Sequence, residues 1–211
     1  MEEKNTMIIA WLGHACFKLE YDGYAIVVDP YADDFIPGLA PLRVSANQVL
    51  CSHDHGDHNF EAGVALEGKE ASPFAVTEID TYHDDQEGAL RGTNKIHIFE
   101  AGDLKVAHLG DLGCELMEDQ KEQLKDLDAV MIPVGGFYTI DAVQAKKLVD
   151  EIKPRVIIPM HYTGENFGFD NIAKLDPFTD QCDLVVEYPE NELALTKETE
   201  AHTAVLALKQ A

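Results

Sequence analysis

The sequence has few basic residues and no long apolar run, and both shortages narrow the class of protein. Its 211 residues include 16 basic against 39 acidic side chains, a formal net charge of −23. Because repulsion of this size disfavours polyanionic partners, we expect binding to neither nucleic acid nor an anionic membrane surface. No stretch approaches the ~20 apolar residues that a membrane-spanning helix needs. The composition favours a small-molecule substrate and leaves open whether the chain forms a homo-oligomer.

Cysteine is also scarce. The four cysteines are Cys16, Cys51, Cys114 and Cys182, and no two form a CxxC pair. This spacing predicts neither a disulfide framework nor a zinc ribbon, and free thiols are typical of a reducing compartment. The acidic start, MEEKNTMIIAWLGHACF, lacks the basic region and long apolar core of a secretory signal. We therefore expect a cytoplasmic protein.

Alternating and apolar runs in the first half of the chain predict a series of β-strands. A length of 211 residues suits one sizeable core, so we predict one domain over residues 1–211. The runs TMIIAWLG, ACFKLEY, YAIVVDP and NQVLCSH predict strands, which we expect to form an antiparallel sheet. Three further strands are predicted in FAVTEI, KIHIFEA and LKVAHLGD, with a hairpin turn at residues 101–103.

Helical spacing begins in the second half. Apolar residues at this spacing predict helices over residues 118–127 and 139–152. Each helix precedes a strand, DAVMIPVG or PRVIIPMH, whose continuous apolar character indicates burial on both faces. Further strands are predicted in LVVEY, ELALT and AVLAL. Many strands with few helices predict an α/β fold of packed sheets with helices outside.

The stretch HDHGDH places three histidines and two aspartates in six consecutive positions after an apolar run. In an extended segment His53 and His55 point to the same side, and Gly56 then allows a sharp turn. Asp57 and His58 can therefore face another direction, so one segment can serve two neighbouring metal ions. Imidazole and carboxylate ligands suit zinc, iron or manganese. A polar loop with incidental histidines is the alternative, and it explains this pattern poorly.

Two metal ions need more ligands than this stretch supplies. Candidates elsewhere in the chain, mostly at strand ends that can aim a ligand, are His83, His97, His108, Asp111 and His161. His97 lies inside KIHIFE, where a half-exposed strand histidine is the better explanation. His108 and Asp111 have opposite parity on one strand, so we expect only one of them at the site, where a carboxylate can bridge two ions.

Together, SHDHGDH, HLGD and PMHY, preceded by VVDP at residues 27–30, resemble the metallo-β-lactamase superfamily over essentially the whole chain. The runs WLGHACFKLE and YHDDQEGALRGTN are similar to its small metal-dependent hydrolases, in the broad group that includes L-ascorbate-6-phosphate lactonase and N-acylphosphatidylethanolamine phospholipase D. This resemblance implies an αββα sandwich of two mixed β-sheets with outer helices. It also implies a site at one edge, between the sheets.

The resemblance further implies two divalent metal ions, with zinc favoured and manganese or iron as alternatives. By position, the first ion would be held by His53, His55 and His83, the second by Asp57, His58 and His161, with Asp111 as the bridge. Asp29, in VVDP, would orient a ligand histidine. For His83, a loop histidine without a metal role stays the alternative, because the gap after His58 is shorter than in many members.

Three residues outside these motifs have open roles. His14, in LGHAC, either caps the first hairpin or acts as a catalytic group that faces the substrate beside the metals. Arg91, in ALRGTN, is one of three arginines and is either a solvated loop residue or a bidentate ligand for a substrate phosphate or carboxylate. Tyr138 either lines the mouth of the site or packs in the fold.

These residues predict a binuclear metal-dependent hydrolase. Two ions ~3.5–4 Å apart lower the pKa of a shared water toward ~7, and the hydroxide attacks an ester, lactone, amide or phosphodiester bond of a small metabolite. Asp57 would bind the second ion and also act as an acid–base group. The sequence lacks the GxSxG elbow and the Gly-rich P-loop, which removes two competing chemistries.

Three rival functions are weaker. A di-iron redox protein of the same fold typically has a carboxylate where this chain has His55, and commonly carries a flavin domain for which 211 residues leave no room. A metallo-nuclease or phosphodiesterase of the same superfamily is disfavoured by the net charge of −23. A metal-binding scaffold without turnover is the non-enzymatic rival, and the complete ligand set argues against it.

Overall fold

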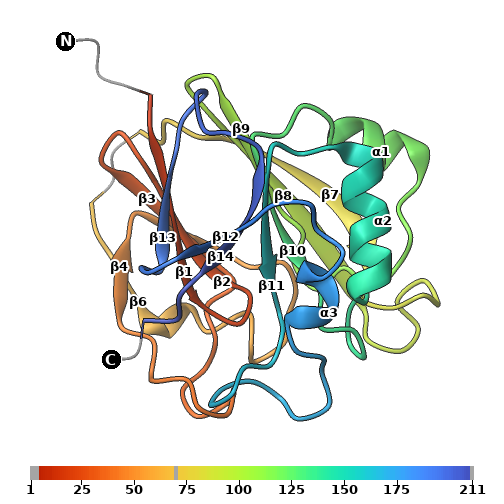
Figure 1. Cartoon of the computed structure of the whole chain (residues 1–211). Helices are drawn as coiled ribbons and strands as arrows, with labels where there is room; N and C mark the ends of the chain where they lie inside the picture. The colour runs from red at the N-terminus through yellow and green to blue at the C-terminus, as the bar shows by residue number, and fades with distance from the viewer. Residues whose placement is uncertain (1–4, 69–70, 210–211) are drawn as a thin grey trace.

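The structure is a computed structural model, which describes residues 5–68 and 71–209. Two β-sheets lie face to face at its centre (Figure 1). The first sheet has the order β13–β1–β2–β3–β5 and consists of β1 (Met7–Gly13), β2 (Cys16–Tyr21), β3 (Tyr24–Val28), β5 (Gln48–Leu50) and β13 (Glu192–Leu195). Strands β1, β2 and β3 are antiparallel, as predicted, whereas β5 pairs parallel to β3. The prediction was wrong for this fourth strand, because residues 29–47 form a crossover that returns the chain to the starting edge.

The second sheet has seven strands. It consists of β7 (Ala75–Tyr82), β8 (Thr93–Ala101), β9 (Leu104–His108), β10 (Ala129–Pro133), β11 (Val156–Met160), β12 (Val185–Tyr188) and β14 (His202–Leu206) in the order β12–β14–β11–β10–β9–β8–β7. The predicted hairpin joins β8 to β9, and β7 is also antiparallel to β8. The remaining pairs are parallel. Every residue of β10 is buried, as its continuous apolar pattern predicted.

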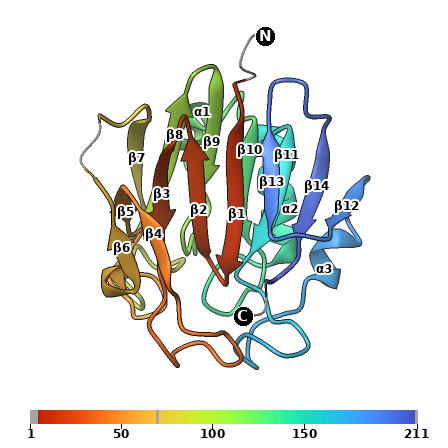
Figure 2. The same cartoon turned by 90° about the vertical axis from the view of Figure 1, so that its left-hand side faces the viewer.

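Helices α1 (Glu118–Gln123) and α2 (Ala142–Ile152) cover the outer face of the second sheet, with the short α3 (Asp176–Thr179) beside them (Figure 1). Asp141 caps α2, since its side chain accepts hydrogen bonds from the backbone nitrogens of Val143 and Gln144. In the described part of the chain, the outer face of the first sheet carries no α-helix. A second apolar cluster, with Val27 and Ile36, packs on this side of the sheet. Strands β4 (Val44–Ala46) and β6 (Val64–Leu66) lie beside the first sheet (Figure 2), and the short 3₁₀ helix η1 (Glu61–Gly63) immediately precedes β6.

The main apolar cluster joins both sheets and the helices. Phe17 and Ile26 come from the first sheet, Phe99 and Met131 from the second, and Leu148 from α2. All but Leu148 are fully buried. The predicted α/β sandwich of two mixed sheets is therefore confirmed, and burial of this continuous core holds the two sheets in a fixed relation.

The structure also bears on the membrane-spanning helices and the cysteines. Across residues 5–68 and 71–209, no helix has the length and apolar character needed to cross a bilayer. The four cysteines are free thiols, as their spacing predicted. Cys16 is buried, and this burial raises the pKa of its thiol well above the ordinary value.

Candidate metal centre

Six strands deliver the predicted site residues to one edge of the sandwich. His14 follows β1, Asp29 follows β3, HDHGDH follows β5, His83 follows β7, Asp111 follows β9 and His161 follows β11. Strands β1, β3 and β5 run in one direction within their sheet, and β7, β9 and β11 do so within theirs. The carboxyl ends of the strands therefore meet, and all of these side chains come together there.

The first group of ligand atoms is the one predicted for the first ion. Nitrogens of His53, His55 and His83 lie within 4.8 Å of one another. The ring centroid of His53 is 4.6 Å from that of His55 and 4.7 Å from that of His83. His83 is buried and His55 is exposed, so this group is open to solvent on one side.

The second group contains one residue more than predicted. Ligand atoms of His14, Asp57, His58 and His161 lie within 4.8 Å of one another. Asp57 Oδ2 is 3.5 Å from His14 Nε2 and 3.6 Å from His58 Nε2. Burial and the neighbouring His161 lower the pKa of His14 to about 4.

His14 has the turn position that the sequence offered as one of two roles, and its ring lies beside the ligand groups. It occupies the turn between β1 and β2 with a left-handed backbone, φ +52°. Its carbonyl oxygen accepts hydrogen bonds from Trp11 Nε1 at 2.9 Å and from the backbone nitrogen of His161 at 3.2 Å. These bonds fix the turn, while the imidazole lies with its centroid 4.0 Å from the ring of His161.

Asp111 lies between the two groups. Its Oδ2 is 3.2 Å from Nε2 of His83 and also 3.2 Å from Nε2 of His161, while its Oδ1 is 3.2 Å from His58 Nε2. One carboxylate thus reaches rings from both groups, which is the position expected of a bridging ligand. Asn94 Oδ1 accepts a 2.9 Å hydrogen bond from the backbone nitrogen of Asp111 and fixes that position. Sequence reasoning missed Asn94, because its role depends on a contact between β8 and the segment after β9.

The cluster fits divalent metal ions. Its buried atoms without a hydrogen-bond partner among the described residues include His14 Nδ1, His53 Nε2, His58 Nε2, His161 Nε2 and Asp111 Oδ1. Some of these atoms lie 3.2 Å from a charged partner without forming a hydrogen bond, as His58 Nε2 and Asp111 Oδ1 do. Because a buried atom that stays unsatisfied costs about 1–3 kcal/mol, this concentration is typical of a site that binds a ligand. Imidazole nitrogen with carboxylate oxygen is the donor set of zinc, manganese and iron sites.

Asp29 supports the cluster from behind, as the resemblance implied. Its Oδ2 accepts a 2.8 Å hydrogen bond from His58 Nδ1 and a 2.6 Å bond from Ser52 Oγ, and its Oδ1 accepts the backbone nitrogen of Ser52 at 2.6 Å. Burial opposes ionisation of Asp29, but the charge of His58 and these hydrogen bonds hold its pKa at about 2. Ser52 Oγ also lies 2.9 Å from His53 Nδ1, so Asp29 and Ser52 together orient two ligand rings.

His97 and His108 are separate from the cluster. His97 is in β8 with 1% exposure, and its Nε2 lies 3.5 Å from Glu78 Oε1. The prediction that it is half-exposed was wrong, because both faces of β8 are covered at this point, where the four consecutive residues 96–99 are buried. His108 donates from Nε2 to the carbonyl of Ala15 at 2.8 Å and accepts at Nδ1 from the backbone nitrogen of Gly110 at 3.1 Å. Of His108 and Asp111, only the carboxylate joins the ligand groups, as parity predicted.

Arg91 lies near the ligands through the loop that follows His83. Its guanidinium carbon is 5.6 Å from the ring centroid of Tyr138 and 6.0 Å from that of Phe137. The Tyr138 ring is in turn 6.5 Å from the ring of His161. Sequence reasoning singled out Tyr138 and missed the neighbouring Phe137, because two adjacent aromatic residues after two glycines give no pattern that says which of them faces a site.

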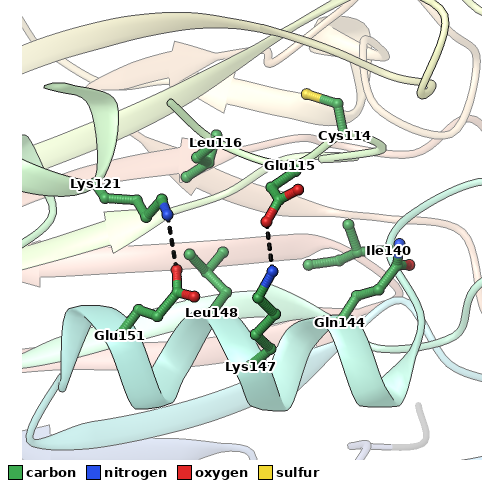
Figure 3. Close-up of a pocket in the computed structure, with 9 residues that line it drawn as sticks. All are labelled: Cys114, Glu115, Leu116, Lys121, Ile140, Gln144, Lys147, Leu148 and Glu151. Carbon is green, nitrogen blue, oxygen red and sulfur yellow. Dashed lines mark hydrogen bonds and ion pairs between the residues drawn. The ribbon is translucent and has the colours of Figure 1, made fainter. Parts of the chain in front are cut away.

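A separate cavity of about 100 Å³ lies beside α2 (Figure 3). Leu116, Ile140 and Leu148 supply apolar side chains to it. Two ion pairs span it, Lys121 with Glu151 at 2.9 Å and Lys147 with Glu115 at 2.5 Å. None of the predicted site residues lines this cavity.

Comparisons with known proteins show that this chain is similar to a known protein family and to several solved structures. The model of the beta-lactamase superfamily domain matches residues 8–161. The UPF0173 metal-dependent hydrolase of Hyperthermus butylicus is 27% identical over 192 residues, which cover 73% of this chain and 82% of that protein. A Thermotoga maritima crystal structure, assigned as a Zn-dependent hydrolase of the metallo-beta-lactamase superfamily, is 35% identical with a TM-score of 0.73 and covers 95% of this chain and 98% of that one. A metallo hydrolase from Ignicoccus hospitalis, 20% identical with a TM-score of 0.64 over 92% of this chain and all of its own, shares the fold.

Proposed function

Because the chain belongs to the metallo-β-lactamase superfamily, we propose that it is a hydrolase that works with two divalent metal ions at the carboxyl ends of its strands. The relatives from Hyperthermus butylicus and Thermotoga maritima, called metal-dependent and Zn-dependent hydrolases, support the class of reaction. One observation carries the two-ion proposal. Asp111 Oδ2 lies 3.2 Å from an imidazole of each ligand group, His83 in the first and His161 in the second.

The ligand assignment follows the two groups, except that His14 is assigned to the substrate side and not to the second ion. The first ion would be held by His53, His55 and His83, the second by Asp57, His58 and His161, with Asp111 shared. Zinc is favoured, and manganese and iron accept the same donors. Asp29 and Ser52 would hold the rings of His58 and His53 with their Nε2 atoms directed to the ions.

Ions bound there would supply a water whose pKa is lowered to about 7, together with a Lewis acid for the substrate oxygen. Asp57 would accept a proton from the attacking water and return it to the leaving group, a role worth ~10²- to 10⁴-fold in rate. His14, whose Nε2 is 3.5 Å from Asp57 Oδ2, is placed to contact the reacting atoms beside it. No side-chain nucleophile is needed.

The substrate is proposed to be a small molecule with an ester, lactone, amide or phosphodiester bond. The net charge of −23 supports this choice over nucleic acid. The names of the relatives from Hyperthermus butylicus and Thermotoga maritima contain no substrate, so the similarity to the L-ascorbate-6-phosphate lactonase group stays a prediction. The cytoplasmic location stays one as well.

Metal reconstitution tests the proposal. Protein stripped by a chelator is loaded with zinc, manganese or ferrous iron, and elemental analysis is combined with hydrolysis of a panel of lactones, esters, amides and phosphodiesters. We expect about two equivalents per chain and a turnover that the chelator abolishes. Asp111→Asn should lose metal, while the matched control Lys147→Gln, at the separate cavity, should keep both ions. A stoichiometry that stays near zero contradicts the proposal.

A further inference from the structure

Arg91 differs from the other two arginines of the chain. Arg43 pairs with Asp33 at 2.5 Å, and Arg155 pairs with Asp128 at 2.5 Å. Within residues 5–68 and 71–209, Arg91 has no carboxylate at ion-pair distance, although the chain has 39 acidic side chains. In so acidic a protein, an arginine without an acidic partner leaves its fork of donors available to an anion from solution.

The backbone of Arg91 is held rigidly against a proposed metal ligand. The carboxylate of Asp84 accepts hydrogen bonds at 2.7–3.0 Å from the backbone nitrogens of Gln86, Gly88, Leu90 and Arg91. The backbone nitrogen of His83 donates at 3.1 Å to the carbonyl of Gly92, the residue after Arg91. The loop therefore closes on itself, and it fixes where the arginine stands relative to His83.

The guanidinium faces the aromatic side of the site. It lies 5.6 Å from the Tyr138 centroid and 6.0 Å from that of Phe137, within the range of cation–π attraction. Tyr138 is also 6.1 Å from Phe169, and Asn171 Nδ2 donates to its hydroxyl at 2.7 Å. Tyr138 is thus held in place between the arginine and the second ligand group.

Two more rings, of Phe169 and Phe35, extend the row that begins with Phe137 and Tyr138. We call these four residues the aromatic wall. Phe169 is 5.5 Å from the ring of His14, and Phe35 is 6.3 Å from Phe169. The ring of Phe35 lies over Gly56 of the HDHGDH stretch, where a Cβ would come within 2.7 Å of it. The wall therefore borders both the second ligand group and the histidine-rich segment.

The two ends of the wall are open to solvent. Phe137 is 63% exposed and Phe35 is 47% exposed. Phe137 also has a left-handed backbone, φ +60°, which is rare for a bulky residue and is maintained only where the surroundings impose it. Exposed rings beside a polar cluster are typical of a surface that a ligand covers.

From the unpaired guanidinium beside these rings, we propose that the substrate is an anion that carries an aromatic or other flat apolar group. Arg91 binds its carboxylate or phosphate, the apolar group lies against Phe137 and the rest of the aromatic wall, and the scissile bond reaches the ligand cluster. This inference rests on the proposed function only for the bond that is cleaved, because the subsite binds such a molecule whether or not it is hydrolysed.

Calorimetric titration with three probes tests the two halves of this subsite. Benzylphosphonate carries both the anion and the ring, methylphosphonate only the anion, and benzyl alcohol only the ring. We expect the wild-type protein to bind benzylphosphonate most tightly. Arg91→Gln should weaken both phosphonates about tenfold or more, because a charge-assisted hydrogen-bonded contact is lost. Phe137→Ala should weaken benzylphosphonate and leave methylphosphonate unchanged.

Matched controls separate this subsite from a general effect. Arg43→Gln removes an arginine that already pairs with Asp33 and should leave all three affinities unchanged. Arg91→Lys keeps the charge without the fork and should give an intermediate affinity, which also guards against misfolding of Arg91→Gln. In metal-free protein, the ratio of each variant's affinity to that of the wild type should be the same as in metal-loaded protein. If the protein fails to bind metal, that result therefore contradicts only the proposed function and not this subsite. If either Arg91→Gln or Phe137→Ala binds benzylphosphonate as the wild type does, the proposal is overturned.

Discussion

Asp29 and His58 form a fully buried pair in which Asp29 Oδ2 accepts a 2.8 Å hydrogen bond from His58 Nδ1. The bond determines which nitrogen of His58 is available, because Nε2 then faces Asp111 Oδ1 at 3.2 Å. The imidazole of His58 therefore connects Asp29, behind the site, to Asp111, the proposed bridging ligand, and its orientation is fixed.

We predict that Asp29→Asn weakens metal binding about 10- to 100-fold, which is the usual effect when a partner behind a ligand histidine is lost. The amide keeps the shape of the carboxylate but not its charge, so it holds the imidazole less firmly. Competition with a chelating dye measures the affinity. The control is Asp33→Asn, a few residues along the chain and paired with Arg43, which should bind metal normally. Equal affinities in the two variants would reduce Asp29 to a structural residue.

A second prediction concerns which histidine completes the first ligand group. His83→Ala is expected to lose about one equivalent of metal, since His83 Nε2 lies 3.2 Å from Asp111. His97→Ala should keep both ions, because His97 faces Glu78 within β8. Elemental analysis after reconstitution, with circular dichroism as the check on folding, compares the two. The opposite pattern would show that the assignment of the first group is wrong.

Asp57→Asn should abolish most turnover, by ~10²- to 10⁴-fold, while the fold and the first ion are retained. The amide loses both the negative charge and the basicity of the carboxylate, whereas His53, His55 and His83 are unchanged. Steady-state hydrolysis of whichever panel substrate proves active, together with metal content, measures the two effects. A near wild-type rate would mean that Asp57 only caps its loop and that the second ion is dispensable.

The fourth prediction concerns stability and pH at Asp128, far from the ligands. Its Oδ2 accepts hydrogen bonds at 2.8 Å from Lys197 Nζ and from the backbone nitrogen of Lys105, and its Oδ1 pairs with Arg155. Burial opposes ionisation, but these contacts, led by Lys197, lower the pKa of Asp128 below its ordinary value. The carboxylate therefore stabilises the fold above the unfolded-state pKa of about 3.9, and this contribution is lost as the pH falls through the lower folded-state value.

Asp128→Asn is accordingly expected to lower the free energy of unfolding by about 1–3 kcal/mol at pH 7. The difference from the wild type should shrink as the pH falls below about 3.9. Denaturant titrations across this range measure it, with the exposed Asp183→Asn as a control that changes little. A difference that does not vary with pH would mean that shape, and not charge, makes Asp128 important.

Local patterns were enough to predict most of the elements. The continuous apolar runs DAVMIPVG and PRVIIPMH predicted strands buried on both faces, and β10 and β11 occupy the interior of the second sheet. The pairing of β5 with β3 was predicted wrongly, because strand direction depends on where the intervening crossover of residues 29–47 leads. No periodicity within either strand contains that information.

The sequence by itself determined the kind of site, because HDHGDH concentrates three imidazoles and two carboxylates within six consecutive residues. Only the tertiary structure decided that His14 joins Asp57 and that Phe137 stands beside Arg91. These pairs come from segments far apart in the chain, and their distances depend on how two sheets pack and where their strands end. Packing and strand ends are set by the whole core, so such contacts leave no local pattern that could be read in advance.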